Sequence, residues 1–290
     1  MYRFPALWLL VICSLVSTAQ TDTMQYKKVE FPEGYTSQLN VVYTKVANWE
    51  GRVDLYLPPK ANGPSPVVVN IHGGGWNKGS KESQTGFSTF FKKGYAVANM
   101  AYRLSQQATA PAAVEDVRGV IIYLINHAKE LNIDVNKIVL MGGSAGGHLA
   151  MVAGFTGSDK KFDNNCQTSK PVHIAAIIDK YGVADVGEWK SKSALQWLGD
   201  KAGDATFIQS VSPLYLVNRN VPPVFIVHGD ADPTVPYQQS VDLKKKLDAA
   251  GVKNRFITIP GGLHGKFSKE ENSMVNKEII SFLKELNIHQ

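Results

Sequence analysis

One serine of this sequence lies among four glycines, in the stretch KIVLMGGSAGGHLA at residues 137–150. The β-branched residues before it predict a short buried strand, and the residues after it favour a helix. Ser144 is therefore expected on a sharp turn from strand to helix, which lifts its hydroxyl clear of the sheet. The glycines suit that turn because a Cβ atom would obstruct the close backbone approach. The pattern G-x-S-x-G at such a turn indicates a nucleophile, but taken alone it fits a plain glycine-rich turn equally well.

A nucleophilic serine needs two partners, because its hydroxyl reacts poorly at neutral pH unless a base takes the proton and an acid orients that base. The segments VFIVHGDADPTVPY at 224–237 and IPGGLHGKF at 259–267 each read as an apolar strand followed by a polar loop. They supply Asp232 as the acid and His264 as the base, in the chain order nucleophile, acid, base. Asp230 is the alternative acid.

The other histidines have simpler explanations. His148 lies one helical turn beyond Ser144, so we expect it to enter the packed layer behind the turn instead of facing the hydroxyl. His228 ends a strand and is expected to order the acid loop, and His72 is expected to support the loop after residues 67–71. The 7 histidines include no H-E-x-x-H motif or close cluster, so we predict no catalytic metal, and no cofactor is implied.

The elements that must position these residues change in character near Pro66. Before the breaker cluster PPKANGPSP, two segments resemble antiparallel strands; they are residues 37–46 and 52–57. After it, continuous apolar runs predict strands covered on both faces; they are 67–71, 95–100, 137–141, 174–178, 224–227 and 255–259. Helical patterns alternate with these runs, at 111–131, 238–250 and 269–286. The alternation predicts an α/β domain with a mostly parallel central sheet and helices on both faces.

One segment interrupts the alternation. Residues 185–220 lie between two predicted strands and are longer than a crossover helix needs. We expect them to form a small cap insertion over the carboxyl ends of the strands. Trp189 and Trp197 of this segment, with Trp76, are candidate substrate-binding residues, although aromatic residues in a cap more often serve packing.

The charged residues do not favour a nucleic-acid partner. The formal net charge is +6, a mild excess, and the lysines at 244–246 have the spacing of a solvated helix face. Arg103 and Asp116 form either an ion pair beneath the site or two separate surface charges.

The N-terminus predicts export. Residues 1–19 contain a basic residue, an apolar run and small residues at the spacing of a signal-peptidase site, which together indicate a cleavable signal peptide. An uncleaved anchor is the alternative, but the apolar run is shorter than the roughly 20 residues of a stable membrane span. Residues 20–290 are expected to form a single domain of a secreted or periplasmic protein, in which Cys166 has no cysteine partner for a disulfide.

Four segments give the chain a family resemblance. It resembles the α/β-hydrolase serine esterases of the hormone-sensitive-lipase-like type, and most closely the bacterial group of acetylxylan and feruloyl esterases. The segments are HGGGW at 72–76, YRL at 102–104, GGSAGG at 142–147 and HGDADPTVP at 228–236. The family pattern H-G-x-x-D, counted from His228, favours Asp232 over Asp230.

The resemblance implies an oxyanion hole and an activity. The backbone N–H groups of Gly73, Gly74 and Ala145 would bind the oxygen that becomes negative during ester cleavage. The implied reaction is hydrolysis of a carboxylic ester through an acyl-enzyme, with acetyl or feruloyl groups on a plant polysaccharide such as xylan as the expected substrate. A generalist carboxylesterase and an amidase similar to arylformamidase are alternatives. A non-catalytic binding protein is disfavoured, because the complete triad is present.

Overall fold

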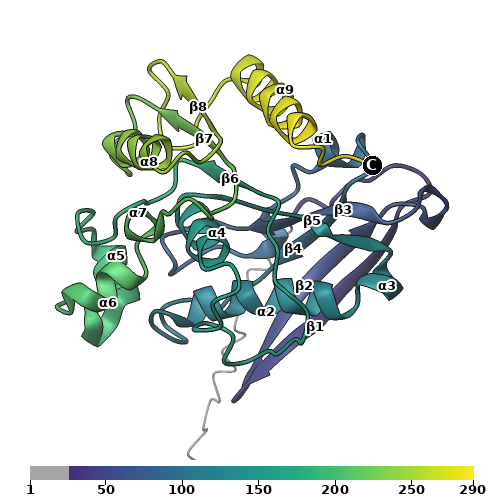
Figure 1. Ribbon diagram of the computed structural model, residues 1–290, viewed down its shortest axis with the longest axis horizontal. Coiled ribbons are helices and arrows are strands. Elements are labelled where there is room, and N and C mark those ends of the chain that lie inside the picture. The colour runs from purple at the N-terminus through teal and green to yellow at the C-terminus, as the bar shows by residue number, and fades with distance from the viewer. Residues whose placement is uncertain (1–25) are drawn as a thin grey trace, which may run out of the picture.

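The apolar runs of the sequence become the strands of one eight-stranded sheet in the computed structural model, which describes residues 26–290 (Figure 1). The strand order is β1-β2-β4-β3-β5-β6-β7-β8. The pairs β1–β2 and β2–β4 are antiparallel, whereas β3 to β8 are parallel. The strands are Thr36–Val46 (β1), Trp49–Leu57 (β2), Ser65–Ile71 (β3), Ala96–Met100 (β4), Ile133–Gly143 (β5), Ala176–Lys180 (β6), Val224–Gly229 (β7) and Asn254–Ile259 (β8).

Helices connect these strands and cover the sheet. The α-helices of the described residues are Ser88–Phe91 (α1), Ala112–Asn126 (α2), Ala128–Leu131 (α3), Ala145–Phe155 (α4), Lys192–Leu198 (α5), Ala205–Ser210 (α6), Pro213–Leu216 (α7), Gln238–Ala249 (α8) and Lys269–Glu285 (α9). Short 3-10 helices lie at Lys60–Asn62, Lys81–Ser83 and Gly199–Lys201. The longest helix, α9, begins with a capping box between Ser268 and Glu271, which satisfies backbone N–H groups of its first turn.

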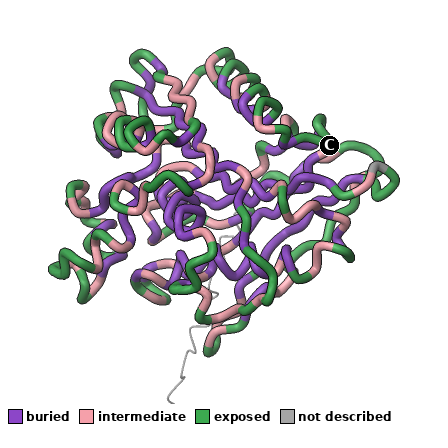
Figure 2. Tube along the Cα trace, viewed as in Figure 1, coloured by how far each residue is buried: buried purple, intermediate pink, exposed green. Residues whose placement is uncertain are grey.

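The two faces of the sheet have separate hydrophobic cores. On one face α2, α4 and α8 contribute Val117, Leu149 and Leu247, all completely buried. On the other face α1 and α9 contribute Phe91 and Phe282. Figure 2 shows buried residues along the central strands and exposed residues on the outer sides of the helices. The predicted arrangement, a mostly parallel sheet with helices on both faces, is confirmed.

Two details of the predicted elements are wrong. Residues 255–259 were expected to be covered on both faces, but β8 is the edge strand beside β7 and most of its residues are only half-buried. Residues 111–131 do not form one helix, because His127 leaves the helical conformation, with φ −102° and ψ 12°, and separates α2 from α3.

A buried ion pair ties the YRL segment to α2. Arg103 Nε donates to Asp116 at 3.0 Å, and the backbone N–H of Arg103 donates to the same carboxylate at 2.7 Å. The Asp116 side chain is fully buried, so the reading of two separate surface charges is wrong. Next to this pair, Tyr102 Oη donates to the carbonyl of His72 at 3.0 Å. The pair therefore anchors a loop that in turn holds the HGGGW segment.

Residues 185–220, the expected cap, fold into the short helices α5, α6 and α7. Trp189, Ser191 and Ser193 of this segment line the same pocket as Ser144. No helix within residues 26–290 is both long and apolar enough to span a membrane. The predicted signal peptide, residues 1–19, lies outside the described residues.

Candidate active site

Ser144 lies on a strained turn between β5 and α4. Its backbone has φ 56° and ψ −123°, a conformation that L-residues rarely adopt, and its N–H donates to Lys180 O at 2.9 Å. Two of the glycines permit the turn: a Cβ atom on Gly142 would lie 2.3 Å from the Gly146 carbonyl carbon, and one on Gly146 would lie 2.1 Å from Ile71 O. The turn is thus strained and presents Ser144 to a pocket, which is the geometry expected of a nucleophile elbow.

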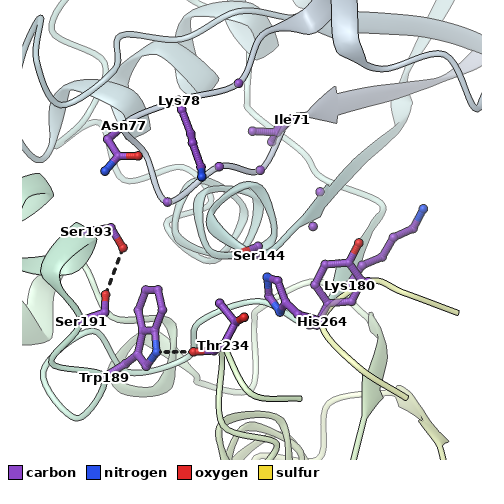
Figure 3. Close-up of a pocket in the computed structure, with 18 of the residues that line it drawn as sticks. Ile71, Asn77, Lys78, Ser144, Lys180, Trp189, Ser191, Ser193, Thr234 and His264 are labelled. Carbon is purple, nitrogen blue, oxygen red and sulfur yellow. Dashed lines mark hydrogen bonds between the residues drawn. The ribbon is translucent and has the colours of Figure 1, made fainter. Parts of the chain in front are cut away.

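His264 reaches the same pocket from the loop after β8. Its ring lies next to Ser144 in Figure 3, and both residues line the pocket. His264 Nδ1 donates to Asp232 Oδ2 at 2.6 Å, which leaves Nε2 as the nitrogen that can accept a proton. Tyr181 contacts the imidazole edge-on at a centroid distance of 4.9 Å. The imidazole is therefore oriented by a carboxylate on one side and by an aromatic ring on another.

Asp232 is buried and fully hydrogen-bonded. Besides His264, its carboxylate accepts from the N–H groups of Thr234 at 2.7 Å and Val235 at 3.0 Å, and from His228 Nε2 at 3.1 Å. These donors hold the carboxylate in one orientation, in a position from which water is excluded. The rival acid, Asp230, instead accepts from the N–H of Gly261 at 2.6 Å and so stabilises the loop before His264.

His228 holds the acid loop, as its place in the sequence predicts. Its side chain is fully buried. Ser240 Oγ donates to Nδ1 at 2.7 Å, and Nε2 donates to both Asp232 and the Val235 carbonyl. Burial lowers the pKa of His228, so a neutral imidazole positions the carboxylate without competing with His264 for a proton.

The HGGGW loop presents backbone donors beside the elbow. Gly73 and Gly74 line the pocket, and a Cβ atom on Gly73 would be only 3.5 Å from Ser144 Cβ. Within residues 26–290, the N–H groups of Gly73, Gly74 and Ala145 donate to no protein acceptor. Ala145 is also the first residue of α4, where the helix dipole favours a negative charge. The three N–H groups are thus available to an anionic oxygen at the serine.

The base of this loop is held by buried aromatic residues. His72 Nδ1 donates to the Gly73 carbonyl at 2.8 Å, and its ring stacks on Tyr102 at a centroid distance of 4.2 Å. Trp76 Nε1 donates to His148 Nδ1 at 3.3 Å, and His148 Nε2 donates to the Val211 carbonyl at 2.8 Å. His148 is completely buried, in the packed layer where the sequence predicted it.

The prediction of substrate binding is wrong for two of the three tryptophans. Trp76 and Trp197 have no exposed surface and stack on each other at a centroid distance of 4.8 Å. They therefore pack beneath the site and do not line it. Trp189 does line the pocket, where its Nε1 donates to the Thr234 carbonyl at 2.8 Å (Figure 3).

The pocket has a volume of about 1260 Å³ and extends well beyond the serine. One wall carries neutral polar side chains that sequence reasoning missed, namely Asn77, Ser191, Ser193 and Gln196. Tyr181, which also lines the pocket, follows the carboxyl end of β6, and this position was the available signal, because ligand sites of parallel sheets lie at carboxyl ends. Within the described residues, no group of three or more His, Cys, Asp or Glu side chains is arranged to hold a metal ion.

Comparison with known sequences identifies the family. The profile of the BD-FAE family matches residues 53–247, and the profile described as TAP-like protein matches residues 208–290. Esterase LipC of Mycobacterium tuberculosis is 26% identical over 222 residues, which cover 70% of this chain and 53% of LipC. This chain therefore spans about half the length of that relative.

Solved structures agree with the profile matches. A truncated carbohydrate esterase from gut microbiota is 29% identical, with a TM-score of 0.80 over 89% of this chain and 99% of that chain. An esterase of Thermogutta terrifontis with bound propionate is 26% identical, with a TM-score of 0.74 over 89% of this chain and 97% of that one. The expected kinship with α/β-hydrolase esterases is confirmed: this chain belongs to the BD-FAE family and has the α/β-hydrolase fold.

Proposed function

We propose that this protein is a serine carboxylic-ester hydrolase that uses Ser144, His264 and Asp232. The observation that carries the proposal is the meeting of three distant loops at one pocket. The elbow serine and the imidazole line that pocket, and the imidazole is held at 2.6 Å by a buried carboxylate. The esterase names of the relatives support the same reaction class.

The geometry defines a role for each group. Ser144 Oγ attacks the ester carbonyl carbon while His264 Nε2 takes the hydroxyl proton, and the developing oxyanion accepts from the unpaired N–H groups of the oxyanion loop and of Ala145. The imidazolium then gives that proton to the leaving alkoxide, so an alcohol departs and an acyl-enzyme remains. His264 next deprotonates a water molecule that attacks the acyl carbon, and the acid is released as Ser144 regains its proton. Asp232 stays ionised throughout and stabilises the imidazolium.

The proposed substrate is an acetyl or feruloyl ester on a polysaccharide such as xylan. The pocket is larger than the roughly 300–1,000 Å³ of most small-ligand sites, and it is lined by Trp189 together with the neutral polar side chains of Asn77, Ser193 and Gln196. Sugars bind through hydroxyl hydrogen bonds and through contacts with aromatic faces. The carbohydrate esterase among the structural relatives supports this substrate class.

Replacing the nucleophile tests the reaction. Ser144→Ala is expected to reduce turnover of 4-nitrophenyl acetate by about 10³-fold or more. The Ser144→Ala variant should also no longer be labelled by a fluorophosphonate. Ser158→Ala, an exposed serine outside the pocket, is the matched control and should retain both. Wild-type turnover by Ser144→Ala would refute the mechanism.

A second experiment tests the substrate class. Acetate release from acetylated xylan is compared with hydrolysis of 4-nitrophenyl acetate, in the wild type and in Trp189→Ala. We expect the variant to raise KM for the polymer several-fold and to leave the aryl ester little changed. Equal effects on both substrates, or no release from the polymer, would instead support a generalist carboxylesterase. Hydrolysis of an N-formyl anilide in preference to either ester would indicate the amidase alternative.

A further inference from the structure

The pocket contains a cation that the proposed reaction does not use. Lys180 is the last residue of β6 and lines the pocket together with Ser144. Its register partner in β5 is Gly143, the residue before the nucleophile. Within residues 26–290, the ammonium group of Lys180 forms no ion pair and donates no side-chain hydrogen bond, and burial lowers its pKa to about 8. The side chain is thus mostly charged at neutral pH but lacks a counter-charge.

The acids of this region do not neutralise Lys180. Successive residues of a strand point to opposite faces, and Asp179 accordingly faces α4, where its Oδ1 accepts from the N–H of Gly182 at 3.0 Å. Asp232 is fully buried behind His264 and is occupied by its own donors. Neither carboxylate lines the pocket.

The charged side chains that line the described pocket all have the same sign. They are Lys78, Lys180 and Lys192, and no aspartate or glutamate is among the lining residues that the structure describes. In Figure 3, Lys78 extends from the loop after the oxyanion glycines towards Ser144, whereas Lys180 lies beyond His264. Clefts lined by one sign of charge raise the local concentration of ligands of the opposite sign. The lining therefore favours a substrate with negative charge.

We propose that the site selects esters that carry a carboxylate, as an acidic sugar does, and that Lys180 is the residue that binds it. This inference rests on the proposed ester hydrolysis and names its substrate class more narrowly. A carboxylate would give the Lys180 ammonium group the partner that it lacks, through a charge-assisted hydrogen bond in a partly buried position. Lys78 and Lys192 are exposed, so solvent and salt screen their contribution and they add mainly long-range attraction.

Pairs of ester probes that are similar in shape but differ in one carboxylate test this preference. For a carboxylate on the alcohol half, 4-acetoxybenzoate is compared with 4-acetoxybenzamide. For a carboxylate on the acyl half, the 4-nitrophenyl monoester of succinic acid is compared with 4-nitrophenyl butyrate. The measured quantity is the ratio of kcat/KM for the charged probe to kcat/KM for its neutral partner, after subtraction of spontaneous hydrolysis. The probe pair whose ratio depends on Lys180 shows whether the alcohol half or the acyl half of the preferred ester carries the carboxylate.

Three variants make the test specific. Lys180→Met removes the charge and keeps the length, Lys180→Arg keeps the charge, and Lys190→Met removes an exposed lysine that does not line the pocket. We expect Lys180→Met to lower the ratio about ten- to hundredfold for one probe pair, the usual effect of losing a hydrogen bond to a charged group. Lys180→Arg should restore most of the ratio, and Lys190→Met should leave it within about twofold of wild type.

The outcomes also separate this inference from the proposed function. Unchanged ratios for both probe pairs in Lys180→Met would overturn the inference, as would an equal fall in Lys190→Met, which would indicate the overall charge instead of this site. Activity of Lys180→Met on the neutral probes shows that the variant is folded. If the wild type hydrolyses none of the probes and no 4-nitrophenyl acetate, the ester hydrolase function fails, whereas neutral hydrolysis without a Lys180 effect refutes only the carboxylate preference.

Discussion

Acidification should weaken the fold through His148, a residue behind the elbow. This imidazole is completely buried between Trp76 and Val211, and it must be neutral at Nδ1 to accept from the tryptophan. Burial lowers its pKa to about 4, against about 6.5 in an unfolded chain. The unfolded state therefore binds a proton more readily between these two values. Stability that is fully present above pH 6.5 is lost as the pH falls towards 4.

The size of this loss follows from the two pKa values. At pH 7.5 both states are nearly deprotonated at this residue, so it contributes almost nothing to the pH dependence. At pH 5 about 97% of unfolded chains and about a tenth of folded chains carry the proton, which corresponds to about 2 kcal/mol of lost stability. Such a loss is a large share of the 5–15 kcal/mol that typical domains possess.

Chemical denaturation at the two pH values measures the effect. His148→Gln keeps a donor for the Val211 carbonyl but cannot be protonated, so the stability difference between wild type and variant should narrow by about 2 kcal/mol from pH 7.5 to pH 5. Because the wild type and the variant share all other titrating groups, the effects of those groups cancel in the difference between the two free energies of unfolding. His173→Gln, at an exposed histidine, should show no such narrowing. A constant difference between wild type and His148→Gln across this range would refute the reasoning.

Three further predictions concern the site and its supports. Asp232→Asn should lower kcat by about 10³- to 10⁴-fold in ester hydrolysis assays, because the amide does not hold His264 in the required tautomer; a fall below tenfold would contradict the triad. Asp116→Ala should reduce the free energy of unfolding by about 3 kcal/mol in urea titrations, since Arg103 would lose its buried partner; unchanged stability would contradict that role. Burial raises the pKa of Asp179 to about 7, so the protonated carboxyl stabilises the fold at low pH and this stabilisation is lost as the pH rises through 7. The free energy of unfolding of Asp179→Asn should therefore increase by roughly 3 kcal/mol relative to that of the wild type between pH 5 and pH 8. A parallel stability profile for the two proteins would contradict this last expectation.

The parts of the site that were predictable from the sequence have local signals. The glycines around Ser144 form a short motif that is visible in the sequence, and the strands before Asp232 and His264 are marked by their apolar runs. The fold class followed from the same runs. Most of the architecture was therefore predictable from the alternation of strands and helices.

The parts that were missed depend on which way a side chain faces after folding. Trp76 has a positive φ of 57°, and its ring packs in the core on Trp197. Tyr181 and Lys180 reach the pocket because β6 ends beside the elbow, a neighbourhood set by strand order and not by sequence distance. No local pattern distinguishes a tryptophan that binds from one that packs.

The edge position of β8 makes the proposed catalysis depend on one border of the sheet. The loop after this half-buried strand supplies the imidazole, while β5 in the middle of the sheet supplies the serine. Border strands separate from their neighbours at lower energetic cost than central ones. Warming should therefore move His264 away from Asp232 while most of the sheet is still intact. If the proposed function holds, loss of esterase activity would precede global unfolding and report the local opening of β8.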